Sequence, residues 1–328
     1  LTGLCGPSGS GKSTLVLDTL VPALAGEEPQ GRWQSLRAPA GGALRVVVVD
    51  TSPIGRSPHS IPATVTGLLA PLRELYARTP DARRLGFTAS HFSFNSTKGR
   101  CQACEGRGAV MVEMQFLADL WLTCDECSGQ RYRPEILEVS LRGRNLAQVL
   151  ELTVDEALEF FEHQPKLVEI LDTLAQVGLG YLTLGQSSTT LSGGEAQRVK
   201  LAGELRRAGG NRAAWGGDVI VLDEPSTGLA AVDTVHLARV LTQLAAGGAA
   251  VVIVEHQAEL LGLCHRLVEL GPGGGAAGGR VIARGTPAEL AGDKASITGP
   301  YLPTKTRRGN KQRPRKKGSV ACAGKKRP

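Results

Sequence analysis

Short apolar runs alternate with helical patterns along most of the chain. The stretches Val46–Val49, Val219–Leu222 and Ala249–Val254 are continuous apolar runs of strand length, as in strands buried on both faces of a parallel sheet. Helical patterns separate them, and one of these covers Leu68–Arg78. Such alternation of strand and helix predicts an α/β fold with a parallel core that is interrupted by an insertion.

Two capping patterns mark helix starts in the middle of the chain. Thr153 has Glu156 three residues on, and Ser192 has Glu195 at the same spacing, so both form a capping box. Inside the second box, each residue of Gly193–Gly194 costs roughly 0.5–1 kcal/mol of helix stability relative to alanine. We therefore expect a close approach to the backbone there. One face of this helix is apolar: Ala196, Val199, Ala202 and Leu205.

Composition bounds the class of protein. The 328 residues are 41% hydrophobic and 21% charged, which is ordinary for a globular chain of one large domain or a few smaller ones. No apolar run approaches the ~20 residues that cross a bilayer, so we expect a cytoplasmic protein with no membrane partner. Only "LTGLC" precedes the first motif, and this abrupt start predicts a fragment that lacks an upstream sheet.

The net charge of +7 comes from one end of the chain. Residues 305–328 hold 11 Lys and Arg and no acid; removing these from the total of 38 leaves 27 basic against 31 acidic residues. Such a low-complexity segment cannot bury a core, and we expect residues 301–328 to be a disordered tail. It is either a basic arm on nucleic acid or a solvated tail without a specific role.

The segment "GPSGSGKS" fits the P-loop pattern G-x-x-x-x-G-K-[S/T] and lies between an expected strand and an expected helix. In a P-loop, backbone N–H groups and the helix N-terminus surround the phosphates of ATP. Lys12 then reaches the β- and γ-oxygens, and Ser13 offers its hydroxyl to Mg²⁺. The alternative is a chance glycine-rich turn. The expected ATP-binding residues here are Gly6, Ser8, Gly9, Ser10, Gly11, Lys12, Ser13 and Thr14.

Two further strands end in residues that suit phosphate transfer. Asp223 in "VIVLDEP" is placed to hold Mg²⁺ through water, and Glu224 to polarise the attacking water. An acidic helix cap is the alternative for this pair. His256 ends "VVIVEH" and is placed to contact the γ-phosphate, although a lone histidine after a strand is usually incidental. The P-loop favours the catalytic interpretation of all three residues.

Four of the seven cysteines form two CxxCxG pairs with 19 residues between them. This spacing suits one closed, tetrahedral zinc site of the structural kind, and a redox dithiol is the rival interpretation. The intervening "VMVEMQF" alternates apolar and polar residues, which predicts a strand of a small ribbon. The expected zinc ligands are Cys101, Cys104, Cys124 and Cys127. Basic neighbours favour a DNA contact, but a solvated face would look the same: Lys98, Arg100, Arg107, Arg131 and Arg133.

The P-loop, the "LSGG" signature, the Asp-Glu strand and the His strand occur in the order of the ABC-type ATPases, which the chain resembles throughout its core. In that family, the signature closes over the γ-phosphate held by a facing core. The resemblance therefore implies that Ser192, Gly193, Gly194 and Glu195 form half of a composite site. It also implies that the chain needs a second core, from a homodimer or from an upstream half.

The cysteine-bearing insert narrows the resemblance. The segments "SPIGRSPHSIPATVTG", "FSFNSTKGRCQACEGRG", "GLGYLTLGQSSTTLSGGEAQRVKLAGEL" and "LDEPSTGL" together resemble the C-terminal half of the excinuclease ABC A-subunit family, over about residues 1 to 295. The resemblance implies a dimeric ATPase of nucleotide excision repair that scans duplex DNA for damage and then loads the excinuclease helicase subunit. It also implies that the zinc module engages DNA.

The family's roles transfer by position. Lys12, Ser13 and Asp223 bind ATP and Mg²⁺, Glu224 activates water and His256 senses the γ-phosphate. The partner-binding insertions of the family's N-terminal half are absent from this chain.

The chain departs from the family pattern at two positions. Thr51 follows Asp50 where the family has a glutamine that couples the nucleotide to the inserted domains. Ala230 stands where the family usually has a histidine.

We therefore expect an α/β fold with an ABC-type P-loop ATPase core, a parallel-rich sheet, an inserted helical signature subdomain and a Cys₄ zinc ribbon. The expected domains are a first core segment with the P-loop at 1–87, the zinc insert at 88–140, the helical subdomain at 141–215, a second core segment at 216–300 and the tail at 301–328. Two alternative functions stay open at this point. One is a drug-resistance or transport ATPase, which the zinc ribbon disfavours; the other is an inactive fragment of the repair protein.

Overall fold

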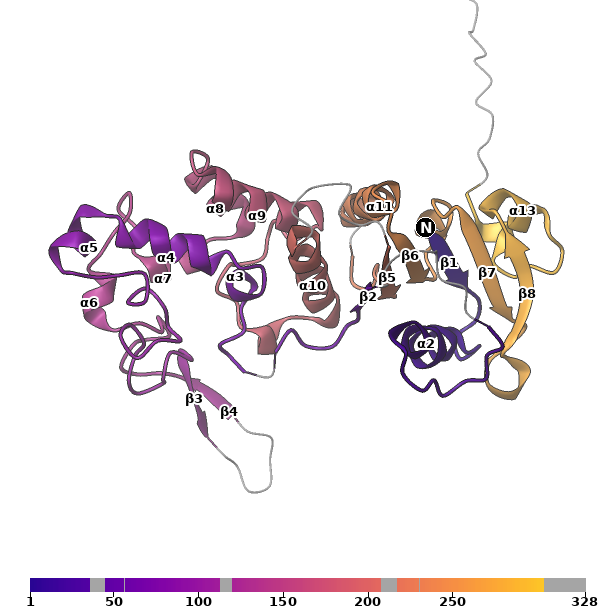
Figure 1. Cartoon of the computed structure of the whole chain (residues 1–328), viewed down its shortest axis with the longest axis horizontal. Coiled ribbons are helices and arrows are strands. Elements are labelled where there is room, and N and C mark those ends of the chain that lie inside the picture. The colour runs from indigo at the N-terminus through magenta and orange to yellow at the C-terminus, as the bar shows by residue number, and fades with distance from the viewer. Residues whose placement is uncertain (36–44, 56, 113–119, 208–216, 230, 304–328) are drawn as a thin grey trace, which may run out of the picture.

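The computed structural model describes residues 1–35, 45–55, 57–112, 120–207, 217–229 and 231–303. A six-stranded sheet lies at one end of the molecule, helices form the rest of its length, and a two-stranded hairpin projects from the helical region (Figure 1). Among the described residues, no helix is both long enough and apolar enough to span a bilayer. Ala230 and residues 304–328 of the expected basic tail lie outside the described residues. The first residues of that expected tail, 301–303, are described, and Leu302 is buried.

The large sheet has the strand order β2-β5-β6-β1-β7-β8. Its strands are β1 Thr2–Cys5, β2 Arg45–Val49, β5 Asp218–Asp223, β6 Ala250–Val254, β7 Arg266–Gly271 and β8 Arg280–Gly285. All neighbouring pairs are parallel except β7 and β8. The pairing aligns Leu4, Val254 and Asp223 in one row across β1, β6 and β5. The parallel sheet predicted from the apolar runs is confirmed.

Helices cover both faces of this sheet (Figure 1). Val219 and Val221 of β5 pack in a cluster with Val16, which follows the P-loop, whereas Ile220 and Leu222 point to the opposite face and belong to the larger core. Burial on both faces explains why the strand is apolar at every position. The helices of this region are α1 Lys12–Leu15, the π-helical turn Val16–Leu20, α2 Val21–Ala25, α11 Ala231–Ala246, α12 Ala258–Leu261 and α13 Pro287–Gly292.

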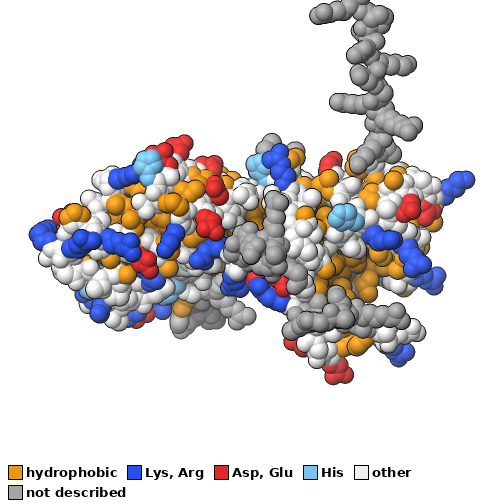
Figure 2. Space-filling model, turned by 45° about the horizontal axis from the view of Figure 1, so that its top comes forward, with side chains coloured by type: hydrophobic (Ala, Val, Ile, Leu, Met, Phe, Trp, Pro, Cys, Tyr) orange, Lys and Arg blue, Asp and Glu red, His pale blue; other side chains and the backbone are white. Residues whose placement is uncertain are grey.

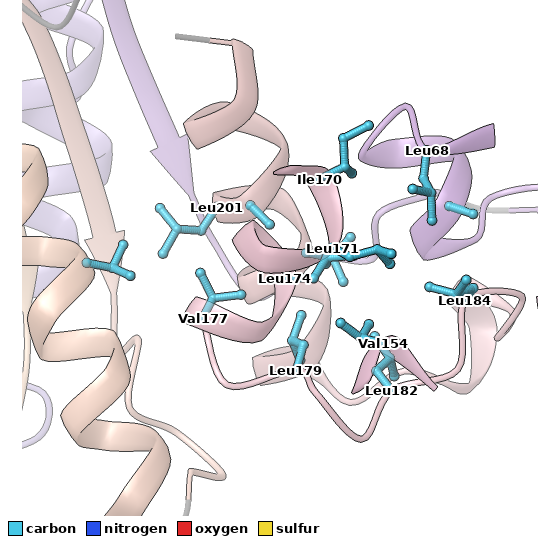
Figure 3. Packing of buried hydrophobic residues seen from close by; sticks show 14 of the residues in the cluster. Leu68, Val154, Ile170, Leu171, Leu174, Val177, Leu179, Leu182, Leu184 and Leu201 are labelled. Atoms are coloured by element: carbon cyan, nitrogen blue, oxygen red, sulfur yellow. The ribbon is translucent and has the colours of Figure 1, made fainter. Parts of the chain in front are cut away.

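The helical region packs around α9 (Figure 3). Leu171 and Leu174 of this helix are fully buried, and Leu182 and Leu184 of the following loop close over them. The helices here are α3 Pro62–Val65, α4 Leu69–Ala77, α5 Pro80–Arg84, α6 Pro134–Leu137, α7 Leu146–Leu150, α8 Val154–Phe160, α9 Pro165–Gln176 and α10 Gly193–Arg207.

Both expected capping boxes are present. Thr153 and Glu156 cap α8 reciprocally, and Ser192 and Glu195 make the same two backbone bonds at the start of α10. Three of the four residues of the predicted apolar face of α10 are buried, and Leu205 is partly buried.

The projecting hairpin consists of β3 Ala109–Val112 and β4 Leu120–Thr123, which pair antiparallel. The beginning of the predicted ribbon strand thus lies in β3, and residues 113–119 lie outside the described residues. Several apolar side chains of the hairpin are about 40–50% exposed: Val110, Met111, Val112, Leu120 and Leu122.

The core of the helical region predicts a stability effect. Leu171→Ala removes a fully buried side chain and should lower the free energy of unfolding by about 2–5 kcal/mol, because it leaves a cavity. Leu263→Ala, at a side chain that is 49% exposed, is the matched control and should cost less than about 1 kcal/mol. Urea unfolding followed by circular dichroism measures both; equal losses would contradict the packing described here.

Candidate functional site

The P-loop follows β1 directly and leads into α1. Gly6 has a φ of 130°, and a Cβ atom on it would lie 2.0 Å from the carbonyl oxygen of Leu270, so only glycine fits. Lys12 begins α1 and is 5% exposed; its Nζ donates to the carbonyls of Gly6 at 3.1 Å and Pro7 at 2.9 Å. Burial lowers the pKa of Lys12 from its ordinary value. The ammonium therefore lies inside the loop that the sequence predicted to surround phosphates.

The carboxylates at the end of β5 face the P-loop. The Oγ atom of Ser13 donates to the carboxylate of Asp223, at 3.3 Å from one oxygen and 3.4 Å from the other. Burial raises the pKa of Asp223, and the neighbouring charge of Glu224 raises it further. A hydroxyl and a carboxylate are oxygen ligands of the kind that Mg²⁺ takes, so this pair fits the expected magnesium site.

Glu224 and His256 meet at the same edge. The Nε2 atom of His256 lies 3.2 Å from Oε1 of Glu224, and both side chains are about half exposed. Glu224 has a φ of 47°, in the left-handed region, and its backbone N–H donates to Val254 at 2.8 Å. The turn after β5 therefore directs the Glu224 side chain toward the histidine at the end of β6.

The signature glycines pack against their own chain. A Cβ atom on Gly194 would lie 2.4 Å from the carbonyl oxygen of Thr227, and one on Gly193 would lie 3.2 Å from Cβ of Thr51. The close approach expected from the sequence is present, and the described neighbours are backbone and side-chain atoms of this chain. Ser192 and Gly193 are exposed, so their outer side is accessible.

Two residues of α10 that the sequence analysis did not single out tie this helix to the sheet. The Nε2 atom of Gln197 donates to the carbonyls of Val49 and Asp223, each at 2.8 Å, and so bridges the ends of β2 and β5. Lys200 donates to Asp50 at 2.5 Å and to the hydroxyl of Ser52 at 2.6 Å. These bonds fix the signature helix to both sides of Thr51. The letters "EAQRVK" carry no pattern that predicts the pairing.

The four expected zinc ligands converge. The Sγ atoms of Cys101, Cys104, Cys124 and Cys127 all lie within 4.8 Å of one another and are buried. Cys101 and Cys124 are 4.0 Å apart, and Cys104 and Cys127 are 3.6 Å apart. Two sulfurs on a tetrahedral zinc with bonds of about 2.3 Å lie about 3.8 Å apart, so the cluster fits the metal. Four cysteine ligands would leave no open position on such a metal, as in structural zinc sites.

The two cysteine knuckles have the same backbone shape. After Cys104, Glu105 and Gly106 have φ of 52° and 83°; after Cys127, Ser128 and Gly129 have φ of 48° and 82°. The repeated left-handed pair explains the glycine in each CxxCxG motif. In each knuckle, a backbone N–H three residues on donates to the carbonyl of the second cysteine, at 3.0 and 2.8 Å.

Two of the five basic residues around the cysteine cluster bond backbone carbonyls of the fold. Arg131 donates to the carbonyls of Pro58 and Gly185, and its guanidinium stacks over the ring of Phe94. Its burial lowers its pKa. Arg133 likewise donates to two backbone carbonyls.

The remaining basic neighbours are more exposed. Arg100 and Arg107 lie within ion-pair distance of Glu105, and Lys98 is exposed. On the face in Figure 2, Lys and Arg side chains are interspersed with Asp and Glu. A DNA contact by the zinc module stays a prediction, and Arg131 is a structural residue.

Comparisons with known proteins agree with this geometry. No family model matches the chain. UvrABC system protein A of Staphylococcus epidermidis is 46% identical over 307 residues, and that of Neisseria meningitidis is 48% identical over 308 residues. Each match covers 92% of this chain and 32% of the relative. Over these residues the chain is similar to UvrA proteins. It spans about a third of the length of the curated UvrA relatives it matches.

A solved UvrA structure has the same fold. The crystal structure of UvrA2 from Deinococcus radiodurans is 50% identical, with a TM-score of 0.82; the match covers 92% of this chain and 36% of that one. The resemblance to the excinuclease ABC A-subunit family is therefore confirmed, as are the parallel-rich sheet and the convergence of the four cysteines.

The cysteine geometry predicts one zinc ion per chain. Metal analysis of the purified protein should find about one equivalent, and Cys124→Ser should lose it, because three thiolates leave a tetrahedral site open. Cys264→Ser, at a buried cysteine outside the cluster, is the control and should keep the metal. A zinc content that is the same in both variants would contradict the assignment.

Proposed function

We propose that the chain is an ATP-hydrolysing, DNA-binding portion of a UvrA-type protein of nucleotide excision repair. One observation carries the proposal: Lys12, Ser13, Asp223, Glu224 and His256 come together at one sheet edge in a chain that is similar to UvrA proteins. The zinc-ligand cluster on the inserted hairpin supports the same assignment over a transport ATPase.

Each residue has a role that its position supports. Lys12 and the P-loop N–H groups bind the phosphates, and Ser13 with Asp223 holds Mg²⁺, which supplies charge neutralisation to the reacting phosphate. Glu224 polarises the attacking water, and His256 orients Glu224 and contacts the γ-phosphate.

The signature supports a composite site. Ser192 and Gly193 are exposed at the start of α10, where helix N–H groups favour an anion. We propose that they close over the γ-phosphate of a second core, from another copy or from the remaining two thirds of a UvrA protein. Duplex DNA is the proposed ligand, and the excinuclease helicase subunit is the proposed partner of the whole protein.

Removal of the proposed base tests the chemistry. Glu224→Gln should lower ATP turnover by about 10²–10⁴-fold, because it removes general-base catalysis, while ATP stays bound and holds two cores together. Phosphate release with and without duplex DNA measures turnover, and sedimentation measures association. Glu259→Gln, at an exposed glutamate, is the control. Turnover that is unchanged in Glu224→Gln would overturn the assignment.

Complementation tests the composite site. Lys12→Ala damages the P-loop and Ser192→Arg blocks the signature, so each variant alone should be inactive. A mixture should recover about a quarter of wild-type turnover, since half the dimers are mixed and each holds one intact site. If Ser192→Arg alone keeps full turnover, the composite site is refuted. A mixture that stays inactive would refute a composite site between two copies of this chain.

A further inference from the structure

Glu255 is a buried carboxylate at the centre of the proposed catalytic edge. It follows the last residue of β6, precedes His256 and is 1% exposed. Its Oε1 atom accepts the backbone N–H of Ser226 at 3.0 Å. Its Oε2 atom accepts the backbone N–H groups of His256 at 2.6 Å and Gln257 at 3.0 Å. The side chain thus joins the turn after β5 to the turn after β6.

These contacts use both oxygens of the Glu255 side chain as acceptors. All three of these partners of Glu255 are N–H donors, which need acceptors on both of its oxygens. A carboxylate offers acceptors on both, whereas an amide offers one acceptor oxygen and one NH₂ donor. Burial of a polar side chain is unfavourable unless it is hydrogen-bonded, and three backbone N–H groups supply those bonds here.

The Oε1 contact fixes the loop that carries Glu224. The Glu224 N–H is bonded to Val254, and Ser226, two residues on, is bonded to Glu255. Both ends of this tight turn are therefore attached to β6 and its following residue. The turn holds Glu224 in the left-handed conformation that directs its side chain to His256.

The same loop touches the signature helix. Thr227 follows Ser226, and its carbonyl lies where a side chain on Gly194 would be. The loop from Glu224 to Thr227 is thus held by Glu255 on one side and by the start of α10 on the other. A shift of Ser226 would therefore displace both Glu224 and the carbonyl of Thr227, against which Gly194 packs.

We infer that Glu255 is a positioning residue of the proposed ATPase: it sets Glu224 in register with His256 and acts through Glu224. The inference rests on the proposed function. It differs from the P-loop roles because Glu255 contacts neither Lys12 nor Ser13 in any described hydrogen bond.

Glu255→Gln tests this role in the full chain. The NH₂ group of the glutamine would face either the N–H of Ser226 or the N–H groups of His256 and Gln257. Because two donors cannot bond each other, the loop that carries Glu224 should shift. Turnover should fall at least about tenfold, toward the ~10²-fold that a misplacement of about 1 Å costs. The affinity for a fluorescent ATP analogue should change less than about twofold, since the P-loop is untouched. Glu259→Gln, which makes the same chemical change at an exposed glutamate, should match wild type in both measurements.

A double variant separates positioning from general damage. If Glu255 acts through Glu224, then adding Glu255→Gln to Glu224→Gln should lower the residual single-turnover rate by less than about twofold. A further tenfold loss in the double variant, wild-type turnover in Glu255→Gln, or parallel loss of analogue binding would each overturn the inference. Absence of turnover in the wild-type protein, with and without DNA, would instead overturn the proposed function.

A second variant applies if Glu255→Gln does not fold. Glu255→Asp keeps the carboxyl group but draws it back by one methylene, so it cannot reach both turns. The same loss of turnover with retained analogue binding is expected. A folded Glu255→Asp protein with wild-type turnover would overturn the inference.

Discussion

The register of three parallel strands is the constraint on which the proposed chemistry depends. Because Leu4, Val254 and Asp223 lie in one row, the segments that leave β1, β6 and β5 begin at the same edge. β1 and β5 are two strand spacings apart, about 10 Å, with β6 between them. Ser13, in the first turn of α1, still reaches Asp223. The parallel arrangement thereby brings residues some 210 positions apart into hydrogen-bond distance.

The features that could be predicted from the sequence are those whose defining residues lie a few positions apart in the chain. The P-loop, the capping boxes and the paired cysteines are each defined by a few neighbouring positions, and the apolar runs show burial on both faces. Gln197, Lys200 and Glu255 could not be found in this way, because their partners are backbone groups or side chains on distant segments. Such buried polar residues can be identified only in the folded structure, where their hydrogen-bond partners lie close to them.

The signature glycines show how one residue pattern can satisfy two demands. The resemblance explains them by a phosphate on a facing core, whereas the structure shows Thr227 and Thr51 of the same chain against them. The two explanations are compatible, since Gly194 is buried against the loop and Gly193 is exposed on its outer side. Thr51, where the resemblance leads us to expect glutamine, places a short side chain against Gly193.

Arg131 connects the four-cysteine cluster to two segments that are distant from it in the sequence. It directly follows the second knuckle, and it bonds the carbonyl of Pro58, in the loop that leaves β2, and that of Gly185, in the segment that enters α10. Through Arg131, the four-cysteine cluster is therefore attached to the loop after β2 and to the segment before α10. If a duplex bound the projecting hairpin, a displacement of the cysteine knuckles would reach both segments through Arg131, and the loop after β2 also through the contact of His59 with the carbonyl of Glu105.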